Sequence, residues 1–235
     1  MKSSKTLLND VFGFNNFRPG QGEIIDAVAS GENVLAIMPT GGGKSLCFQL
    51  PALLNDGLTV VISPLIALMR DQVRGLQAAG VVAGAITSGN TQEETDTVFS
   101  QIISGDLNLL YMAPERLNSS RIQNILRKAN VASLAVDEAH CVSQWGHDFR
   151  PDYLNIGKLR RSLGVPLSAF TATADNETQQ EIIERLFDGV TPKTFLRGFD
   201  RPNIFLSFVP KDKPRRQIMD FVQQRKGQSV SYTHL

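Results

Sequence analysis

A run of three glycines followed by lysine and serine is the first feature of this chain that suggests chemistry. The stretch MPTGGGKSLC, residues 38–47, follows an apolar segment and precedes a helical pattern that begins at Lys44. Each ordered glycine costs backbone entropy, so three in succession need a reason. Between a strand and a helix, such a loop points backbone N–H groups at phosphates, while lysine adds a point charge and serine a Mg²⁺ ligand. We therefore predict a nucleotide-phosphate and Mg²⁺ site at Thr40, Gly41, Gly42, Gly43, Lys44 and Ser45, with Ser45 as the metal ligand.

The agreement with the phosphate-loop pattern is partial at its start, because Met38 stands where the pattern has its first glycine. The alternative interpretation is a glycine turn before a helix that happens to open with Lys-Ser.

Two adjacent carboxylates, Asp137 and Glu138, end the apolar segment 131–136. Phosphoryl transfer to water needs one carboxylate for the metal and another to orient and deprotonate the attacking water. We predict that Asp137 binds the metal and that Glu138 is the catalytic base; a solvated acidic turn is the alternative. His140 is expected to connect the γ-phosphate side to Gln144 or to the segment 168–174. Two histidines on one loop without a third ligand do not predict zinc.

The elements that must position these groups alternate along the chain. Six apolar segments predict strands and lie at 33–38, 58–62, 82–86, 107–112, 131–136 and 166–172. Helical patterns separate them, including a helix after Lys44, one that reaches about Gly80, and others at 92–105 and 176–187. This alternation predicts an α/β fold with a mostly parallel sheet, helices on both faces and a ligand site at the carboxyl ends of the strands.

Composition bounds the possible functions. The chain has 235 residues, 42% of them hydrophobic, and a net charge of +1, so a DNA-binding function must rest on local features. Two cysteines 94 positions apart, the lack of a long apolar run and the lack of a signal-peptide core predict a cytoplasmic protein.

The composition changes after about Phe199. A proline-rich stretch with clustered Lys and Arg precedes one strand pattern, at 204–209, and one helix pattern, at 213–227. We expect residues 1–199 to form one domain and 200–235 a linker with the incomplete start of another. The last residues, SYTHL, continue no clear strand pattern, and we expect that they are not native.

Several motifs occur in the order found in superfamily 2 helicases, and the chain resembles that group: PTGGGKS (39–45), SPLIALMRDQ (63–72), APERL (113–117), DEAH (137–140) and SAFTATA (168–174). FRPGQ (17–21) and CVSQWGHDFRPDY (141–153) narrow the resemblance to the RecQ family of DNA helicases. It covers about residues 7–205. It implies two RecA-like lobes, of which this chain holds the first. It also implies ATP and Mg²⁺ as cofactors, 3′→5′ translocation on single-stranded DNA, unwinding of forked duplexes, and a role in repair and recombination.

The resemblance also assigns roles upstream of the glycine loop. Phe14 would stack on adenine, Arg18 would support it, and Gln21 would hydrogen-bond the edge of the base. Phe14 stands where members of the family often carry tyrosine. The alternative is that Phe14 and Phe17 are core aromatics around a Pro-Gly turn.

Four further segments receive DNA-binding or coupling roles. Trp145, Phe149 and Arg150 lie in a loop whose aromatic and cationic side chains suit stacking on single-stranded bases; packing under a long loop is the alternative. Ser63 would contact the DNA backbone, or merely cap a helix. Thr171 and Thr173 would couple the nucleotide state to lobe movement, or be ordinary strand hydroxyls before a helix that starts at Asp175 or Asn176.

Two other function classes stay open. One is a different superfamily 2 motor, such as an RNA helicase. The other is a nucleotide- or DNA-binding module without turnover, which describes the isolated chain better because it lacks the second lobe and the arginine that a second lobe supplies.

Overall fold

The computed structural model describes residues 3–144, 148–197 and 210–224. The chain divides into two units, residues 1–199 and residues 200–235. Each unit is described by itself.

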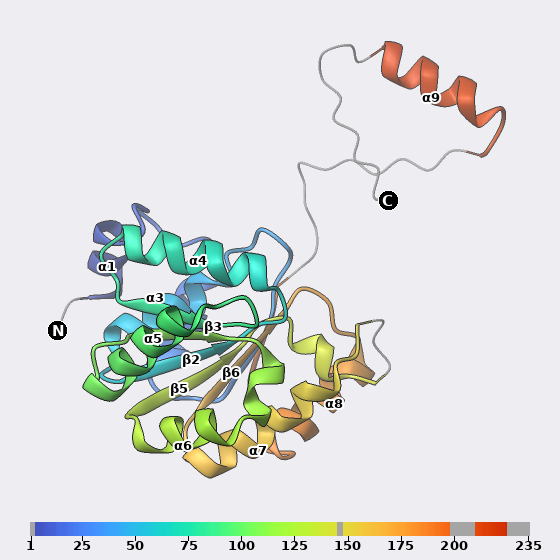
Figure 1. Ribbon diagram of the computed structural model, residues 1–235. Helices are drawn as coiled ribbons and strands as arrows, with labels where there is room; N and C mark the ends of the chain where they lie inside the picture. The colour runs from blue at the N-terminus through green and yellow to red at the C-terminus, as the bar shows by residue number, and fades with distance from the viewer. Residues whose placement is uncertain (1–2, 145–147, 198–209, 225–235) are drawn as a thin grey trace. The chain divides into compact units, whose positions relative to one another are not determined.

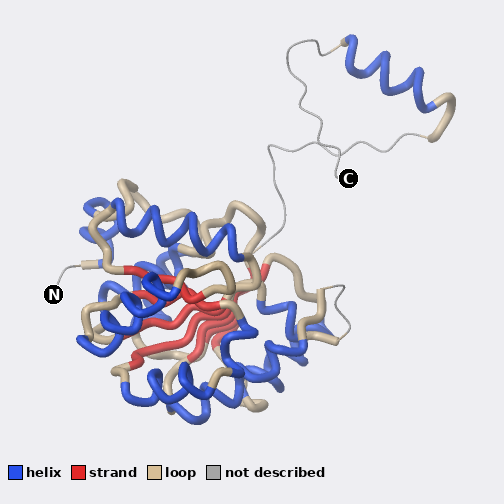
Figure 2. The backbone as a smooth tube through the Cα atoms, viewed as in Figure 1, coloured by secondary structure: helices blue, strands red, loops and turns tan. Residues whose placement is uncertain are grey.

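The first unit is built on one sheet whose described strands all run parallel. The strand order is β3-β4-β2-β5-β6-β1-β7, so β3 and β7 are the edges. Figure 2 shows the strands together at the centre with helices around them. The strands are β1 (Val34–Ile37), β2 (Leu58–Ile62), β3 (Ala83–Ile86), β4 (Leu109–Met112), β5 (Val131–Val136), β6 (Leu167–Thr171) and β7 (Lys193–Leu196).

Helices cover both faces of this sheet because alternate residues of the buried strands point to opposite sides. Val34 and Ala36 of β1 join one apolar cluster, and Leu35 and Ile37 join the other. Figure 1 shows α3 and α4 on one side and α6, α7 and α8 on the other. The first layer holds α1 (Ser4–Asp10), α2 (Gln21–Ala29), α3 (Leu46–Leu54) and α4 (Ile66–Ala78); the second holds α5 (Gln92–Ser104), α6 (Ser120–Lys128), α7 (Leu154–Leu163) and α8 (Asn176–Phe187). The described residues also contain three short 3₁₀ helices, η1 (Pro114–Asn118), η2 (Ala139–Val142) and η3 (Pro151–Tyr153).

The predicted α/β fold is confirmed, and each of the six predicted strands is present within one or two residues of its expected bounds. The helices at 92–105 and 176–187 are also present. Asp175 caps α8 by accepting the N–H of Thr178 at 2.8 Å, as one alternative expected. The helices α1 and α2 and the short edge strand β7 were not predicted. The strand expected at 204–209 lies outside the described residues.

The second unit contains α9 (Pro214–Gln223), where a helix was predicted. Its large apolar side chains are exposed, between 44% and 63%, at Ile218, Met219, Phe221 and Val222.

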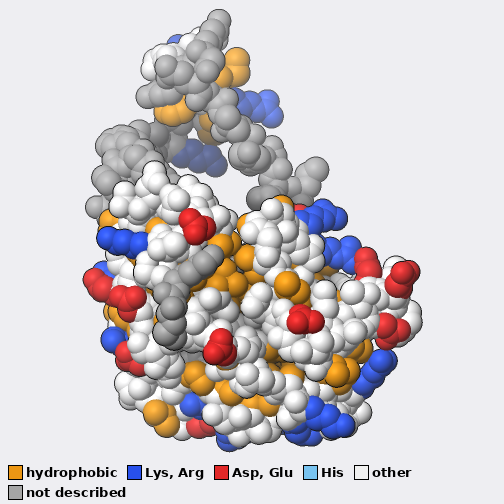
Figure 3. Space-filling view, turned by 90° about the vertical axis from the view of Figure 1, so that its left-hand side faces the viewer, with side chains coloured by type: hydrophobic (Ala, Val, Ile, Leu, Met, Phe, Trp, Pro, Cys, Tyr) orange, Lys and Arg blue, Asp and Glu red, His pale blue; other side chains and the backbone are white. Residues whose placement is uncertain are grey.

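One face of the first unit carries charges of both signs. Lys, Arg, Asp and Glu side chains are interspersed on the face of the first unit drawn in Figure 3, in keeping with a net charge of +1. No helix in the described part of the chain is long and apolar enough to cross a bilayer.

Two helical glycines provide a matched test of the packing between the second-layer helices. A Cβ on Gly157 of α7 would collide with the backbone oxygen of Arg185 on α8, whereas a Cβ on Gly75 of α4 would meet nothing within 4 Å. Gly157→Ala should lower the free energy of unfolding by about 1–3 kcal/mol, because backbone cannot yield like a side chain. Gly75→Ala should raise it by about 0.5–1 kcal/mol. Urea denaturation followed by circular dichroism measures both, and equal effects of the two substitutions would contradict the close α7–α8 contact.

Candidate nucleotide and metal site

The parallel sheet places the predicted phosphate and metal residues on one side, at the carboxyl ends of its central strands. The loop 38–45 follows β1, Ser63 follows β2, Asp137 follows β5, and Thr171 ends β6; these four strands are neighbours in the sheet. Backbone hydrogen bonds hold their ends in register. Met38 N–H donates to the oxygen of Thr171 at 3.0 Å, and Asp137 N–H donates to the oxygen of Ile62 at 2.8 Å.

The glycine loop adopts a backbone that other residues would resist. Gly41 and Gly43 have φ of 78° and 81°, in the left-handed region. Gly42 has no positive φ, but a Cβ there would lie 2.8 Å from the oxygen of Pro39. The path of the chain therefore favours glycine at all three positions, and phosphate binding by this loop stays a prediction.

Lys44 and Ser45 close the loop at the start of α3. The Nζ atom of Lys44 donates to the oxygen of Met38 at 3.4 Å, so the ammonium group reaches back over the loop. The Oγ atom of Ser45 accepts a hydrogen bond from Nε2 of Gln72, on α4, at 3.1 Å. Both side chains are half-buried.

The upstream motif contacts the loop directly. Arg18 donates from Nη1 to the oxygen of Gly41. Gln21 is buried, and its Nε2 donates to the oxygens of Gly42 and Gly43 at 3.3 and 3.2 Å, while its Oε1 accepts the N–H of Arg18 at 2.8 Å. The amide of Gln21 is thus engaged by the loop in this structure, and its contact with adenine stays a prediction.

Phe14 and Phe17 separate the two interpretations given for the aromatic pair. Phe17 packs against the apolar cluster under α1 to α4, as a core aromatic would. Phe14 is 55% exposed, which leaves its ring face open for stacking.

Asp137 is a buried carboxylate without a neutralising partner. Its Oδ1 accepts the N–H of Glu138 at 3.0 Å, and its Oδ2 accepts the hydroxyl of Ser63 at 3.3 Å. Burial, and secondarily the negative charge of Glu138, raise the pKa of Asp137 from 3.8 to about 6; Lys44 opposes this rise. Within the ranges that the structure describes, no Lys or Arg nitrogen forms a salt bridge with Asp137.

Glu138 and His140 belong to one polar cluster. Glu138 has φ 49° and ψ 48°, a left-handed conformation that costs of order 1 kcal/mol for a residue with a side chain. Its Oε2 lies 3.4 Å from Nδ1 of His140, and the same nitrogen lies 2.9 Å from Oγ1 of Thr171. Of the two partners expected for His140, the structure therefore shows the segment 168–174. Thr171 is buried and its hydroxyl donates to the oxygen of Thr173, whose side chain is exposed.

The aromatic loop is only partly described. Trp145 and His147 lie outside the described residues. Phe149 is half-buried, and so is Arg150, which donates from Nη1 to the oxygen of Pro64 at 3.4 Å. DNA contacts by these residues stay predictions.

Ser63 is placed with the acidic pair. Its side chain is 2% exposed, and its hydroxyl bonds to Asp137. The helix-cap alternative is wrong, because α4 has its N-cap at Leu65 and no side-chain cap. A contact of Ser63 with DNA stays a prediction.

Three polar residues join the site without having been predicted for it. Gln72 contacts Ser45, and Tyr153, which is fully buried, donates to the oxygen of Asp137 at 3.0 Å. Glu181 accepts from the hydroxyl of Ser143 at 2.5 Å and from the N–H of Gln144 at 2.9 Å. Gln72 is the last residue of the motif SPLIALMRDQ, so the motif itself could have indicated a role for it. Nothing in the sequence near Glu181 indicates its contact, because its partner Ser143 is 38 residues away.

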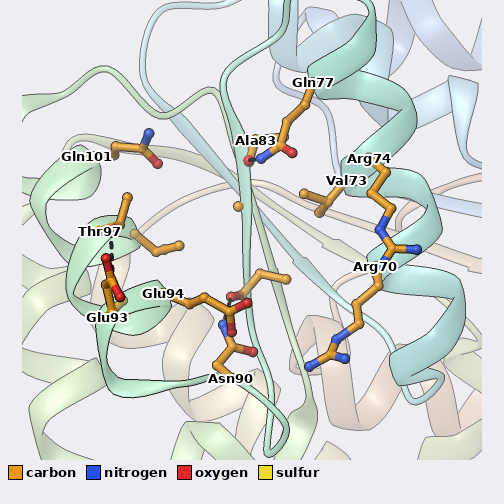
Figure 4. Close-up of a pocket in the computed structure, with 13 residues that line it drawn as sticks. Arg70, Val73, Arg74, Gln77, Ala83, Asn90, Glu93, Glu94, Thr97 and Gln101 are labelled. Atoms are coloured by element: carbon orange, nitrogen blue, oxygen red, sulfur yellow. Dashed lines mark hydrogen bonds between the residues drawn. The ribbon is translucent and has the colours of Figure 1, made fainter.

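A separate groove of about 430 Å³ lies between α4 and α5 beside the edge strand β3. In Figure 4, Arg70 and Arg74 line one wall, and Glu93 and Glu94 the other. None of the predicted site residues is among the described residues that line it. The predicted site residues therefore lie outside this groove.

The comparisons with known proteins agree with the motifs. The family model described as DEAD/DEAH box helicase matches residues 18–182. The ATP-dependent DNA helicase RecQ of Haemophilus influenzae is 47% identical over 225 residues, which are 95% of this chain and 36% of that protein. RecQ of Bacillus subtilis is 42% identical over 98% of this chain and 39% of its own length. The predicted resemblance to RecQ helicases is confirmed, and the chain spans about a third of the length of these relatives.

Solved structures support the fold. The helicase domain of Pyrococcus furiosus Hef aligns with a TM-score of 0.61 at 20% identity, over 83% of this chain and 40% of that one. The DUF1998 helicase MrfA aligns with a TM-score of 0.73 at 18% identity, over 100% of this chain and 39% of that one.

The raised pKa of Asp137 predicts a pH-dependent stability. The unfolded chain keeps a pKa near 3.8 while the folded chain has about 6, so the ionised carboxylate destabilises the fold above pH 6 and the penalty disappears as the pH falls to about 4. Asp137→Asn should therefore be more stable than the parent at pH 7.5 by about 1–3 kcal/mol. The gain should vanish near pH 4. Urea denaturation at both pH values measures this difference, and a variant less stable than the parent at pH 7.5 would contradict a destabilising buried carboxylate.

Proposed function

This chain belongs to the DEAD/DEAH box helicase family, and from that premise we propose that it is the first, ATP-binding lobe of a RecQ-type DNA helicase. The parent protein would couple ATP hydrolysis to 3′→5′ translocation on single-stranded DNA and to the unwinding of forked duplexes in repair and recombination. It would act in the cytoplasm, on the nucleoid in a bacterium. The observation that supports the proposal is that the loop 38–45 follows β1 while Asp137 and Glu138 follow β5, so both lie at the carboxyl ends of strands in one parallel sheet.

The nucleotide would bind along the glycine loop. Backbone N–H groups of residues 41–45 suit phosphate oxygens, and Lys44 supplies the compensating charge. Phe14 offers an exposed ring beside the motif that ends at Gln21, where the adenine would lie. Gln21 and Arg18 would hold the glycine loop in place on the side where the adenine binds, since both donate to carbonyl oxygens of the loop.

The donor set fits Mg²⁺. A hydroxyl at Ser45 and an unpaired buried carboxylate at Asp137 are hard oxygen ligands, the kind that this ion prefers. When bound, Mg²⁺ neutralises charge that develops on the transferred phosphate. Binding of a cation would also remove the electrostatic penalty at Asp137, whose pKa is raised by burial.

Glu138 is the proposed general base, and His140 its link to the rest of the lobe. The carboxylate of Glu138 is partly exposed, 24% of its side chain, and so can reach a water. Its contact with His140, and that of His140 with Thr171, would report the state of the hydrolytic site to the segment 171–173. Arg150 connects the aromatic loop to Pro64, one residue after the partner of Asp137, so DNA bound there would act on the same cluster.

The second unit would be a linker and the start of a second RecA-like lobe. Ile218, Met219 and Val222 give α9 an exposed apolar surface that would suit packing within such a lobe. The relatives are about three times as long as the matched segment. For the isolated chain, a nucleotide-binding lobe with little turnover is therefore the better description.

Turnover by the 235-residue chain tests this account. We expect weak binding of ATP·Mg²⁺ and negligible hydrolysis, with or without single-stranded DNA, because the rate contribution of an arginine from the second lobe, about 10³–10⁵-fold, is missing.

Lys44→Ala should weaken binding about ten- to a hundredfold through loss of a charge-assisted contact. Glu138→Gln should bind like the parent. Fluorescence titration and phosphate release measure the two quantities. DNA-stimulated turnover that Glu138→Gln abolishes would show instead that this lobe suffices for hydrolysis.

Base recognition has its own test. Phe14→Ala should weaken ATP binding about fivefold to a hundredfold through loss of stacking, while Phe14→Tyr keeps the ring and should bind like the parent. Inorganic tripolyphosphate is the matched ligand, because it fills only the phosphate loop. Phe14→Ala should leave its affinity unchanged, and an equal loss for both ligands would contradict a stacking role.

A further inference from the structure

A chain of three hydrogen bonds runs from the interior of the sheet to the hydroxyl of Ser45. Gln49 of α3 donates from Nε2 to the hydroxyl of Tyr111 on β4 at 2.8 Å, and to Oε1 of Gln72 on α4 at 3.4 Å. Gln72 donates from Nε2 to Oγ of Ser45 at 3.1 Å. None of these three residues belongs to the phosphate loop or to the acidic pair.

The inner end of this chain is fixed. Tyr111 is 1% exposed and Gln49 is 8% exposed, and the Tyr111 ring packs edge-on against Phe48. A buried amide without a partner would cost about 1–3 kcal/mol, so Gln49 keeps its position. The half-buried Gln72 is thereby held from the inside.

The order of donors determines the state of Ser45. Because an N–H of Gln49 faces Oε1 of Gln72, the amino group of Gln72 must face Ser45. Ser45 accepts that bond with one lone pair. The rotation of its hydroxyl is restricted, and a second lone pair remains for a cation.

The same segment also contacts the other candidate metal ligand. Ser63 donates to Oδ2 of Asp137 at 3.3 Å, and Gln72 lies nine residues later on the helix that this turn starts. The segment 63–72 thus contacts Ser45 through one end and Asp137 through the other.

We propose that Gln72 is a positioning residue for the metal: it orients the Ser45 hydroxyl so that Ser45 and Asp137 together accept Mg²⁺ with the nucleotide. This inference rests on the proposed function. The competing explanation is that Gln72 only ties α4 to α3. The two differ in what they predict without Mg²⁺, because a packing defect would weaken nucleotide binding under all conditions.

The experiment is a titration of the full chain with a fluorescent, non-hydrolysable ATP analogue, in Mg²⁺ and in EDTA. Gln72→Met keeps the length of the side chain and removes the amide. We expect binding in Mg²⁺ to weaken about three- to tenfold, the effect of one lost hydrogen bond, and binding in EDTA to stay unchanged. The matched control is Gln77→Met on the same helix, whose amide donates to the oxygen of Ala83 at 2.7 Å; it should bind like the parent in both media.

A double-mutant cycle closes the test. Gln72→Met combined with Ser45→Ala should bind no more weakly than Ser45→Ala alone, because Gln72 acts through Ser45. An unchanged Mg²⁺-dependent affinity for Gln72→Met, an equal loss in EDTA, or additive losses in the cycle would each overturn the inference while leaving the proposed function intact. Failure of the parent chain to bind the analogue in Mg²⁺ would overturn the proposed function, and this inference with it.

Discussion

The alignment of four parallel strands is the constraint on which the candidate site depends. Four neighbouring strands, β2, β5, β6 and β1, run in the same direction, so their carboxyl ends lie on the same side of the sheet. Backbone bonds from Met38 to Thr171 and from Asp137 to Ile62 extend this register one residue past the strands, into the turns that carry the chemistry. Groups separated by about a hundred residues, such as Ser45 and Asp137, therefore share an edge without any direct bond between them. Apolar residues of the two helix layers pack against the strands on both faces of the sheet.

The site is electrostatically unfavourable in the form seen here, and this fits a role in binding a cation. Asp137 is buried with a raised pKa, and Glu138 next to it adopts a left-handed backbone. Residues held in such strained or unpaired states occur most often at functional sites, where bound ligands relieve them. Ser63 and Tyr153 donate hydrogen bonds to Asp137, and Gln72 donates one to the hydroxyl of Ser45.

The sequence predicted the buried strands well because their apolar segments are continuous and the helices between them carry clear caps, such as Asp175. It did not predict β7, a four-residue edge strand whose side chains are largely exposed, because an exposed strand has no apolar pattern. The glycine loop and Asp137 were predictable, since their chemistry is local. The hydrogen bonds of Gln72, Tyr153 and Glu181 were not, because each depends on a partner 16 to 38 residues away that only the fold brings near. The burial of Ser63 could not be predicted either, because its partner Asp137 is 74 residues away in sequence.

The central claim is that one edge of the sheet binds the phosphates and the metal together. A crystal structure of the 235-residue chain with a non-hydrolysable ATP analogue and Mn²⁺ in place of Mg²⁺ tests it most directly, because Mn²⁺ can be located by its anomalous scattering. The account predicts phosphates against the backbone of residues 41–45 and an anomalous peak within coordinating distance of the Ser45 hydroxyl or the Asp137 carboxylate, or of waters bound to them. A nucleotide in the groove between α4 and α5, or a metal peak remote from both Ser45 and Asp137, would contradict it.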